Sequence, residues 1–168
     1  AVPQEVVAYG LFINQDMFDR YNLKQPETPE EFLECCRVFK ENGIETPVGA
    51  NRWWLETFVL AQAYADLYNG GNAQTEIAAL NSGKSKYSDY MRPGFKFLKK
   101  MIDRGYIDAE KASVSEAIEG EGQDFRDQKT PIVMAYWGAA NSDTAYGDLD
   151  FNMQVIGFPS SRGQMPVM

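Results

Sequence analysis

Three stretches of the chain have the mixture of β-branched and aromatic residues that is typical of buried strands. Residues 5–14 (EVVAYGLFIN) form the first, and their pattern suits a strand that is buried on both faces. Residues 131–137 (PIVMAYW) and 151–158 (FNMQVIGF) form the other two. Residues 46–51 (TPVGAN) contain too much Pro and Gly for a helix, so a short strand or loop is expected there.

Between the first two strands, apolar residues recur at the three- and four-residue spacing of helices. The clearest helix start is Thr28-Pro29 with Glu31, a capping box with Pro at the first helical position, and Asn42-Gly43 ends this helix. Its expected buried stripe consists of Phe32, Cys35, Cys36 and Phe39.

Further helices are expected at residues 53–68, 72–80 and 88–104. The last of them carries apolar residues at helical spacing, namely Met91, Phe95, Leu98 and Ile102. A second capping box, Ser113-Val-Ser-Glu116, predicts another helix start, and a short helix is expected after Gly138.

This order of strands and helices predicts a helix-rich α/β fold. The length of 168 residues suits one domain that spans residues 1–168 and folds without a disulfide or metal. No stretch is long and apolar enough to span a bilayer. The chain begins Ala-Val-Pro-Gln without a Met, signal peptide or lipid-anchor motif, so we expect an excised or processed segment.

Charge and composition exclude several classes of function. Sixteen Lys and Arg against 24 Asp and Glu give a net charge of −8, which argues against a nucleic-acid partner. The chain contains no histidine, so it has no Ser–His triad, no His-based acid/base catalysis and no His-ligated metal site. The two adjacent cysteines lack the CxxC spacing of redox and metal sites, and we expect both to be small buried hydrophobes.

Carboxylates are therefore the only acid/base groups available. Candidates by residue type are Asp16, Asp19, Glu30, Glu31, Glu34 and Asp143. Most acidic residues lie in the first turns or on the polar faces of expected helices, where solvation and the helix dipole account for them.

The tryptophans give a more specific signal. Trp53 and Trp54 open a helix directly after a loop, and Trp137 ends an apolar strand just before Gly138. Strand ends and helix starts are where α/β proteins place groups that face ligands. An exposed indole offers a flat apolar face for the C–H face of a pyranose, although packing in the core explains these residues equally well.

Six segments, taken in order, resemble segments of family 1 extracellular solute-binding proteins, the sugar-binding components of ABC importers. Tyr9–Phe18 (YGLFINQDMF) is similar to the family's YGLYYNKDLF stretch, and Pro131–Ala139 is similar to its strand and turn that contain GSW. The other four segments are Pro26–Phe39, Gly43–Trp53, Phe97–Ala112 and Val155–Ser160. Each motif is weak by itself, but six in the same order make a specific signal.

The resemblance implies one lobe of a two-lobed, periplasmic-binding-protein-like fold of type II, with the sugar held in a cleft between hinged lobes. Residues 1–168 would be mainly the second, helix-rich lobe, bounded by inter-lobe crossings near 1–10 and 156–168. The full-length protein would then be extracellular or periplasmic, a membrane-anchored lipoprotein whose partners are a carbohydrate ligand and the permease subunits of the importer.

The resemblance also implies the binding residues. Trp137, within Tyr136-Trp137-Gly138, stands near the Trp of GSW and would stack on the sugar. Trp53 matches the family's DGW and would line the same cleft, with Asn51 and Trp54 as neighbours. It implies no catalytic residue, no metal and no cofactor.

Two other functions fit the composition. A carbohydrate-active enzyme fragment would need two carboxylates about 5–10 Å apart in one pocket near Trp53 and Trp137. A helical protein-interaction module would present a flat apolar patch instead of a Trp-lined concavity.

Overall fold

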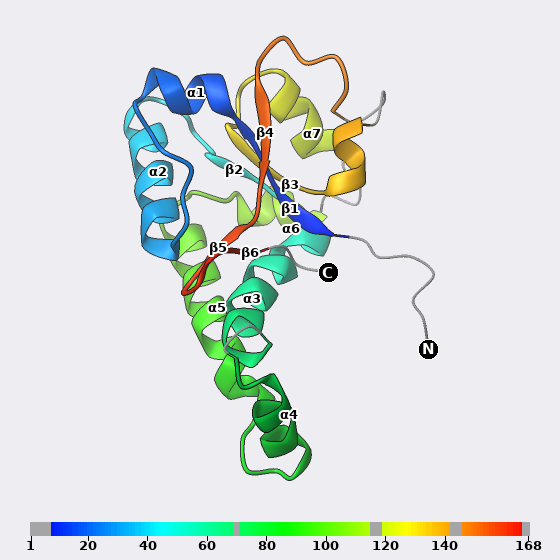
Figure 1. Cartoon of the computed structure of the whole chain (residues 1–168). Helices are drawn as coiled ribbons and strands as arrows, with labels where there is room; N and C mark the ends of the chain where they lie inside the picture. The colour runs from blue at the N-terminus through cyan, green and yellow to red at the C-terminus, as the bar shows by residue number, and fades with distance from the viewer. Residues whose placement is uncertain (1–7, 69–70, 115–118, 142–145, 166–168) are drawn as a thin grey trace.

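The computed structural model describes residues 8–68, 71–114, 119–141 and 146–165. Its centre is a four-stranded sheet in the order β2-β3-β1-β4 (Figure 1). The strands are β1 (Tyr9–Asn14), β2 (Val48–Gly49), β3 (Ile132–Tyr136) and β4 (Met153–Ile156). Strand β1 is antiparallel to both its neighbours, whereas β2 and β3 are parallel.

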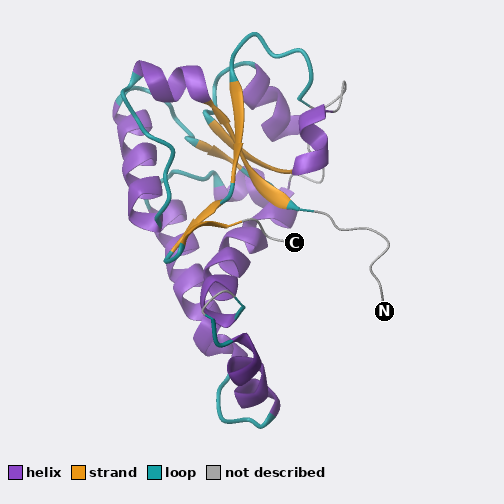
Figure 2. Ribbon diagram, in the orientation of Figure 1, coloured by secondary structure: helices purple, strands orange, loops and turns teal. Residues whose placement is uncertain are grey.

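Helices cover both faces of this sheet, and some of them extend beyond it (Figure 2). They are α1 (Gln15–Arg20), α2 (Pro29–Glu41), α3 (Arg52–Leu67), α4 (Ala73–Asn81), α5 (Tyr87–Asp103), α6 (Ala109–Val114), α7 (Glu119–Arg126) and the 3₁₀ helix η1 (Trp137–Asn141). A hairpin of β5 (Phe158–Ser160) and β6 (Gly163–Met165) packs against α3. Helix α4 lies at the end of a projection made with α3 and α5 (Figure 1).

Alternate side chains of the central strands enter two separate hydrophobic clusters, as the pleat of a sheet requires. In β1, Leu11 and Ile13 join the cluster beneath α1, α2, α3 and α5, whereas Phe12 joins the cluster beneath α7 and η1. Strand β3 divides in the same way between Met134 and Val133. The prediction of a strand buried on both faces is therefore confirmed for residues 9–14; residues 5–7 lie outside the described part of the chain.

Helix α2 matches its prediction closely. The Thr28 side chain accepts a hydrogen bond from the Glu31 backbone, and the Glu31 carboxylate accepts from the Thr28 backbone, so the capping box is formed. Its stripe is buried, including both cysteines. Burial raises the pKa of the Cys35 thiol to about 12 and that of Cys36 well above its ordinary value, which agrees with two unreactive hydrophobes.

The structure differs from the predicted elements in three places. Helix α1 follows directly after β1, where Asn14 caps it by accepting from the Met17 backbone, and the sequence pattern did not indicate it. Ser113 does not begin a helix: it lies inside α6, and its hydroxyl donates to the Glu110 carbonyl. Glu116, its expected partner, lies outside the described residues. The third strand is divided at Gly157 into β4 and β5.

Helix α5 is present as expected, and Leu98 of its expected stripe packs partly buried against the larger cluster, but the most buried residues are others. Gly94, Phe97 and Met101 pack inward, whereas Phe95 is 58% exposed. A Cβ at position 94 would lie 2.5 Å from the carbonyl oxygen of Val59, so α5 touches the backbone of α3 at this point. Only glycine permits so close an approach, and this contact decides which face of α5 is buried.

Candidate functional site

The residues expected to bind sugar converge on one edge of the sheet. Because β2 and β3 are parallel, their carboxyl ends lie at the same edge. Strand β2 leads through Ala50 and Asn51 into α3, and β3 leads directly into η1 at Trp137. In open α/β sheets this edge is where ligands bind. We call it the aromatic edge; its residues are Tyr9, Asn51, Trp53, Trp54, Tyr136 and Trp137.

Asn51 is 1% exposed and joins two helices. Its Oδ1 accepts a hydrogen bond from the Trp54 backbone at 3.2 Å, which caps the first turn of α3. Its Nδ2 donates to Oε1 of Glu121 in α7 at 2.5 Å. The structure thus gives Asn51 a defined role in holding the start of α3, and its predicted contact with ligand stays a prediction.

Trp54 lies against the first residue of β1. Its ring centroid is 5.3 Å from that of Tyr9, with the planes tilted by 54°. The indole is partly buried against the larger hydrophobic cluster. Its Nε1 is enclosed and has no hydrogen-bond partner among the described residues. Trp54 therefore forms a packed layer behind the first turn of α3.

Tyr136 ends β3 directly opposite Tyr9 of β1. Its ring is half-buried and lies over Gly138: a Cβ at position 138 would be 2.9 Å from Tyr136 Cε2. Glycine at position 138 therefore leaves room for the ring. The backbone places Trp53 in the first turn of α3 and Trp137 at the start of η1, while their side chains lie outside what the structure describes.

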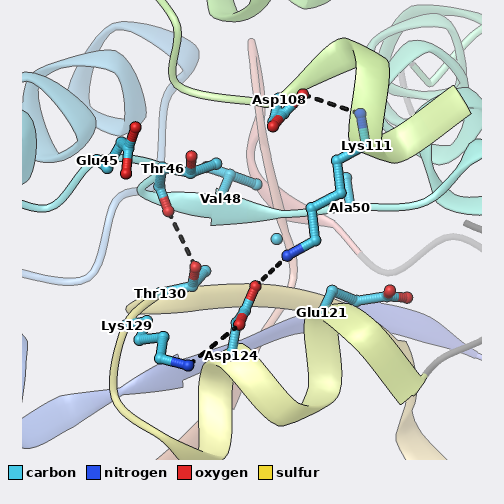
Figure 3. Close-up of a pocket in the computed structure, with 11 residues that line it drawn as sticks. Glu45, Thr46, Val48, Ala50, Asp108, Lys111, Glu121, Asp124, Lys129 and Thr130 are labelled. Carbon is cyan, nitrogen blue, oxygen red and sulfur yellow. Dashed lines mark hydrogen bonds and ion pairs between the residues drawn. The ribbon is translucent and has the colours of Figure 1, made fainter.

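A cavity of about 240 Å³ lies beside β2, where α6, α7 and the residues just before β3 approach the strand (Figure 3). Its lining residues are Glu45, Thr46, Val48, Gly49, Ala50, Asp108, Lys111, Glu121, Asp124, Lys129 and Thr130.

The two lysines of this cavity both lie beside one of its four carboxylates. Lys111 forms an ion pair with Asp124 of α7, and Lys129 lies 3.8 Å from the same carboxylate. The Thr130 hydroxyl donates to the Thr46 carbonyl at 3.0 Å. The Glu121 carboxylate points away from the Lys111–Asp124 pair (Figure 3) and reaches Asn51 instead. The ion pair beside this cavity thus connects α6 to α7, next to β2. The hydrogen bond of Glu121 to Asn51 connects α7 to the aromatic edge.

Sequence reasoning missed Glu121. It is 70 residues from Asn51 and belongs to a helix whose start was predicted incorrectly. Its environment is what distinguishes it, because a carboxylate only 3% exposed is rare unless it is paired. No local pattern in the sequence carries that information.

The carboxylates considered as acid/base candidates have structural or solvent-exposed positions. Asp16 accepts from the Asn152 backbone, and Asp19 accepts from Gln15 on the same helix. Glu34 pairs with Arg37 on the surface of α2. Asp16 and Asp19 follow the carboxyl end of β1, which antiparallel pairing puts at the opposite end of the sheet from Tyr9 and Tyr136. Glu30 and Glu31 lie in the first turn of α2, and Asp143 lies outside the described residues.

Within the described ranges, no group of three or more Cys, Asp or Glu side chains is placed to hold a metal ion. Among the described helices, none combines the length and the apolar character needed to cross a bilayer.

Comparison with protein families gives one match, which covers nearly the whole chain. The model of the family described as "Bacterial extracellular solute-binding protein" matches residues 2–163. None of the curated proteins matches the sequence significantly.

Solved structures share the fold. A family 1 extracellular solute-binding protein from Bifidobacterium longum subsp. infantis superimposes with a TM-score of 0.73 at 21% identity, over 92% of this chain and 39% of its own. A sugar transporter from Bacillus licheniformis in complex with stachyose gives 0.72 at 21% identity, over 94% and 42%. One from Arthrobacter chlorophenolicus A6 with bound laminaribiose gives 0.65 at 16% identity, over 98% and 40%.

These similarities confirm the helix-rich α/β fold of periplasmic-binding-protein type. The chain spans about two fifths of the length of the structures it matches. At such identities the likeness concerns the fold alone.

Proposed function

Because the chain belongs to the family of bacterial extracellular solute-binding proteins, we propose that it supplies one lobe of a protein that binds a sugar or oligosaccharide for import by an ABC transporter. Solute-binding proteins of this family are not enzymes. They hold a ligand and release it unchanged, which fits a chain without histidine. The length of the matched structures supports a second lobe, with the sugar enclosed between the two.

The convergence of the predicted binding residues on the aromatic edge is the observation that carries this proposal. Residues from the start of α3, the end of β3 and the start of β1 meet there, although they are distant in sequence. Aromatic rings with amide and hydroxyl groups match the two faces of a sugar, since its C–H face is apolar and its hydroxyl groups form hydrogen bonds.

Within this edge we assign different roles. Trp137 and Trp53 stack on the sugar, and Tyr136 borders them from the end of β3. Trp54 and Asn51 form the layer beneath, because the indole packs on Tyr9 and the amide caps α3. Residues 1–168 are mainly the second lobe, with crossings to the other lobe near residues 1–10 and 156–168.

We further propose that the full-length protein is extracellular or periplasmic and anchored to the membrane, where it delivers its ligand to the permease subunits. The family consists of extracellular and periplasmic proteins, and one similar structure is that of a probable secreted solute-binding lipoprotein from Streptomyces coelicolor. The two neighbours with bound sugars support a carbohydrate ligand, because stachyose and laminaribiose were found in them.

Titration calorimetry of the full-length protein with stachyose, laminaribiose and a wider panel of oligosaccharides tests the proposal. We expect saturable heat with at least one glycan and much weaker binding by the 168-residue lobe alone, which offers only part of the contacts. W137A is expected to weaken binding about a hundredfold, in line with loss of an aromatic hot spot. The matched control is F95A, which removes an exposed aromatic ring from α5.

Heat with no glycan, combined with tight binding of a peptide or a metal chelate, would overturn the sugar assignment. Turnover of a glycan would instead favour the carbohydrate-active enzyme.

A further inference from the structure

A hydrogen bond between two enclosed side chains links α7 to the ligand-facing end of α3. Glu121 is 3% exposed and Asn51 is 1% exposed, and Asn51 Nδ2 donates to Glu121 Oε1 at 2.5 Å. A hydrogen bond to an ionised acceptor in an enclosed place is stronger and more directional than one between neutral groups in water.

The partners of Asn51 permit only one orientation of its amide. A carboxylate can only accept, so Glu121 must face the NH₂ group. The backbone N–H of Trp54 can only donate, so it must face the amide oxygen. Glu121 therefore determines which way the amide points, and the amide oxygen is thereby held over the first turn of α3.

The position of Glu121 is itself fixed by close packing and by an ion pair. A Cβ at Gly49 would lie 3.1 Å from the Cβ of Glu121, so glycine in β2 lets α7 approach the strand closely. One turn further along α7, Asp124 pairs with Lys111 of α6 beside the same cavity (Figure 3). The carboxylate of Glu121 thus projects from a helix anchored on both sides.

We propose that Glu121 is a positioning residue of the sugar site: through Asn51 it fixes the first turn of α3 and so the backbone position of Trp53 within that turn. This inference rests on the function proposed above. Glu121 does not contact the sugar, and it acts by orienting the amide that caps the helix. Its removal changes the geometry of the aromatic edge more than it changes the stability of the fold.

Four variants of the full-length protein separate this role from a merely structural one. E121L removes the acceptor, whereas E121Q keeps an acceptor oxygen in the same place. N51D retains the cap on α3 but opposes two carboxylates. In the double variant N51D/E121Q the glutamine amide can donate to the new carboxylate, which restores the hydrogen bond with donor and acceptor reversed. Q123L, on the exposed side of α7, is the matched control.

The ligand-free readout is ¹⁹F NMR of protein labelled with 5-fluorotryptophan, with the Trp53 resonance assigned by W53F. We expect E121L and N51D to shift or broaden this resonance, and E121Q, N51D/E121Q and Q123L to leave it in place. An unchanged Trp53 resonance in both E121L and N51D overturns the positioning role, and so does a double variant that still resembles N51D. If E121L does not fold, N51D and the double variant decide in the same way.

The second readout is calorimetry with the glycan to which the wild-type protein binds. We expect E121L to weaken binding about tenfold, as for loss of a charged hydrogen bond, and E121Q to remain within about twofold. Wild-type affinity in E121L overturns the proposal. If the wild-type protein binds no glycan, the proposed function fails, while the Trp53 resonance still decides whether Glu121 orients the first turn of α3.

Discussion

The start and the middle of helix α3 are held by different kinds of interaction. At its first turn, Asn51 and Glu121 form hydrogen bonds of defined direction. In its middle, Phe58 packs edge-on against Phe97 and Phe158, with ring centroids 6.0 and 5.3 Å away, and Val59 touches Gly94. The start of α3 is positioned by polar groups, and its middle is fixed by close packing of apolar groups.

This difference indicates which part of α3 determines the stability of the fold and which part determines the geometry of the binding site. Burial of large apolar side chains contributes most to the free energy of unfolding but is non-directional. A buried hydrogen bond contributes about 1 kcal/mol net, yet it fixes orientation. We therefore expect changes in the middle of α3 to affect stability and changes at its start to affect binding.

The largest expected effect concerns the middle of α3. F58A should lower the free energy of unfolding by about 3–5 kcal/mol, because it leaves a cavity among packed rings. Urea denaturation measures this loss. F95A is the matched control and should change stability by less than about 0.5 kcal/mol, since Phe95 is largely exposed. Equal losses in the two variants would contradict the assigned core.

A slightly smaller loss is expected from G94A. The added Cβ would meet the backbone of Val59, which cannot give way without separating α3 from α5, and we expect a cost of about 2–3 kcal/mol. G122A is the control in another helix, where the new Cβ would lie 3.5 Å from the Tyr146 hydroxyl and is expected to change stability by less than about 1 kcal/mol. If G94A is as stable as the wild-type protein, the helices do not touch as described.

At the aromatic edge we expect a substitution to affect glycan binding more than it affects the free energy of unfolding. G138A places a methyl group against the movable ring of Tyr136, so it should change stability by less than about 1 kcal/mol and weaken glycan binding about fivefold. Denaturation and calorimetry on the same sample measure both quantities. A large loss of stability with unchanged affinity would show that Gly138 has a structural role and does not shape the binding site.

The smallest effect is expected at the exposed cap of α2, although Phe32 in the same helix packs against Phe58. The backbone N–H groups of Glu27 and Thr28 donate to Glu31 and hold the pKa of its carboxyl below the ordinary value of 4.5. A lowered pKa stabilises the folded state above the ordinary pKa, and the benefit disappears as pH falls through the lowered value. Wild-type protein should thus exceed E31Q in stability at pH 7 and converge with it in acid, as urea midpoints at several pH values would show. A difference that stays constant with pH would contradict this origin.

The sequence predicted those elements whose signals are local. Helix α2 was predicted completely because Thr28, Pro29, Glu31 and Gly43 specify its two ends without help from the rest of the fold. The buried face of α5 was missed because it depends on the contact of Gly94 with Val59, a residue of another helix. Apolar spacing alone placed Phe95 in the buried stripe and left Phe97 out of it.

The candidate site shows the same division. Strand ends, helix starts and the family resemblance together indicated Asn51, the tryptophans and Tyr136. Glu121 was not indicated, because only folding brings α7 beside the end of β2. A positioning residue in a neighbouring helix leaves no pattern in the sequence near the residues that it orients.

The central claim is that the aromatic edge binds the ligand, whereas the packed middle of α3 stabilises the fold. Hydrogen exchange with and without bound glycan tests this claim most directly. We predict that a saturating glycan slows amide exchange at residues 51–55 and 136–140 and leaves residues 58–67 and 95–101 unchanged. Protection confined to the cavity beside β2, at residues 108–111 and 124–130, would contradict the account.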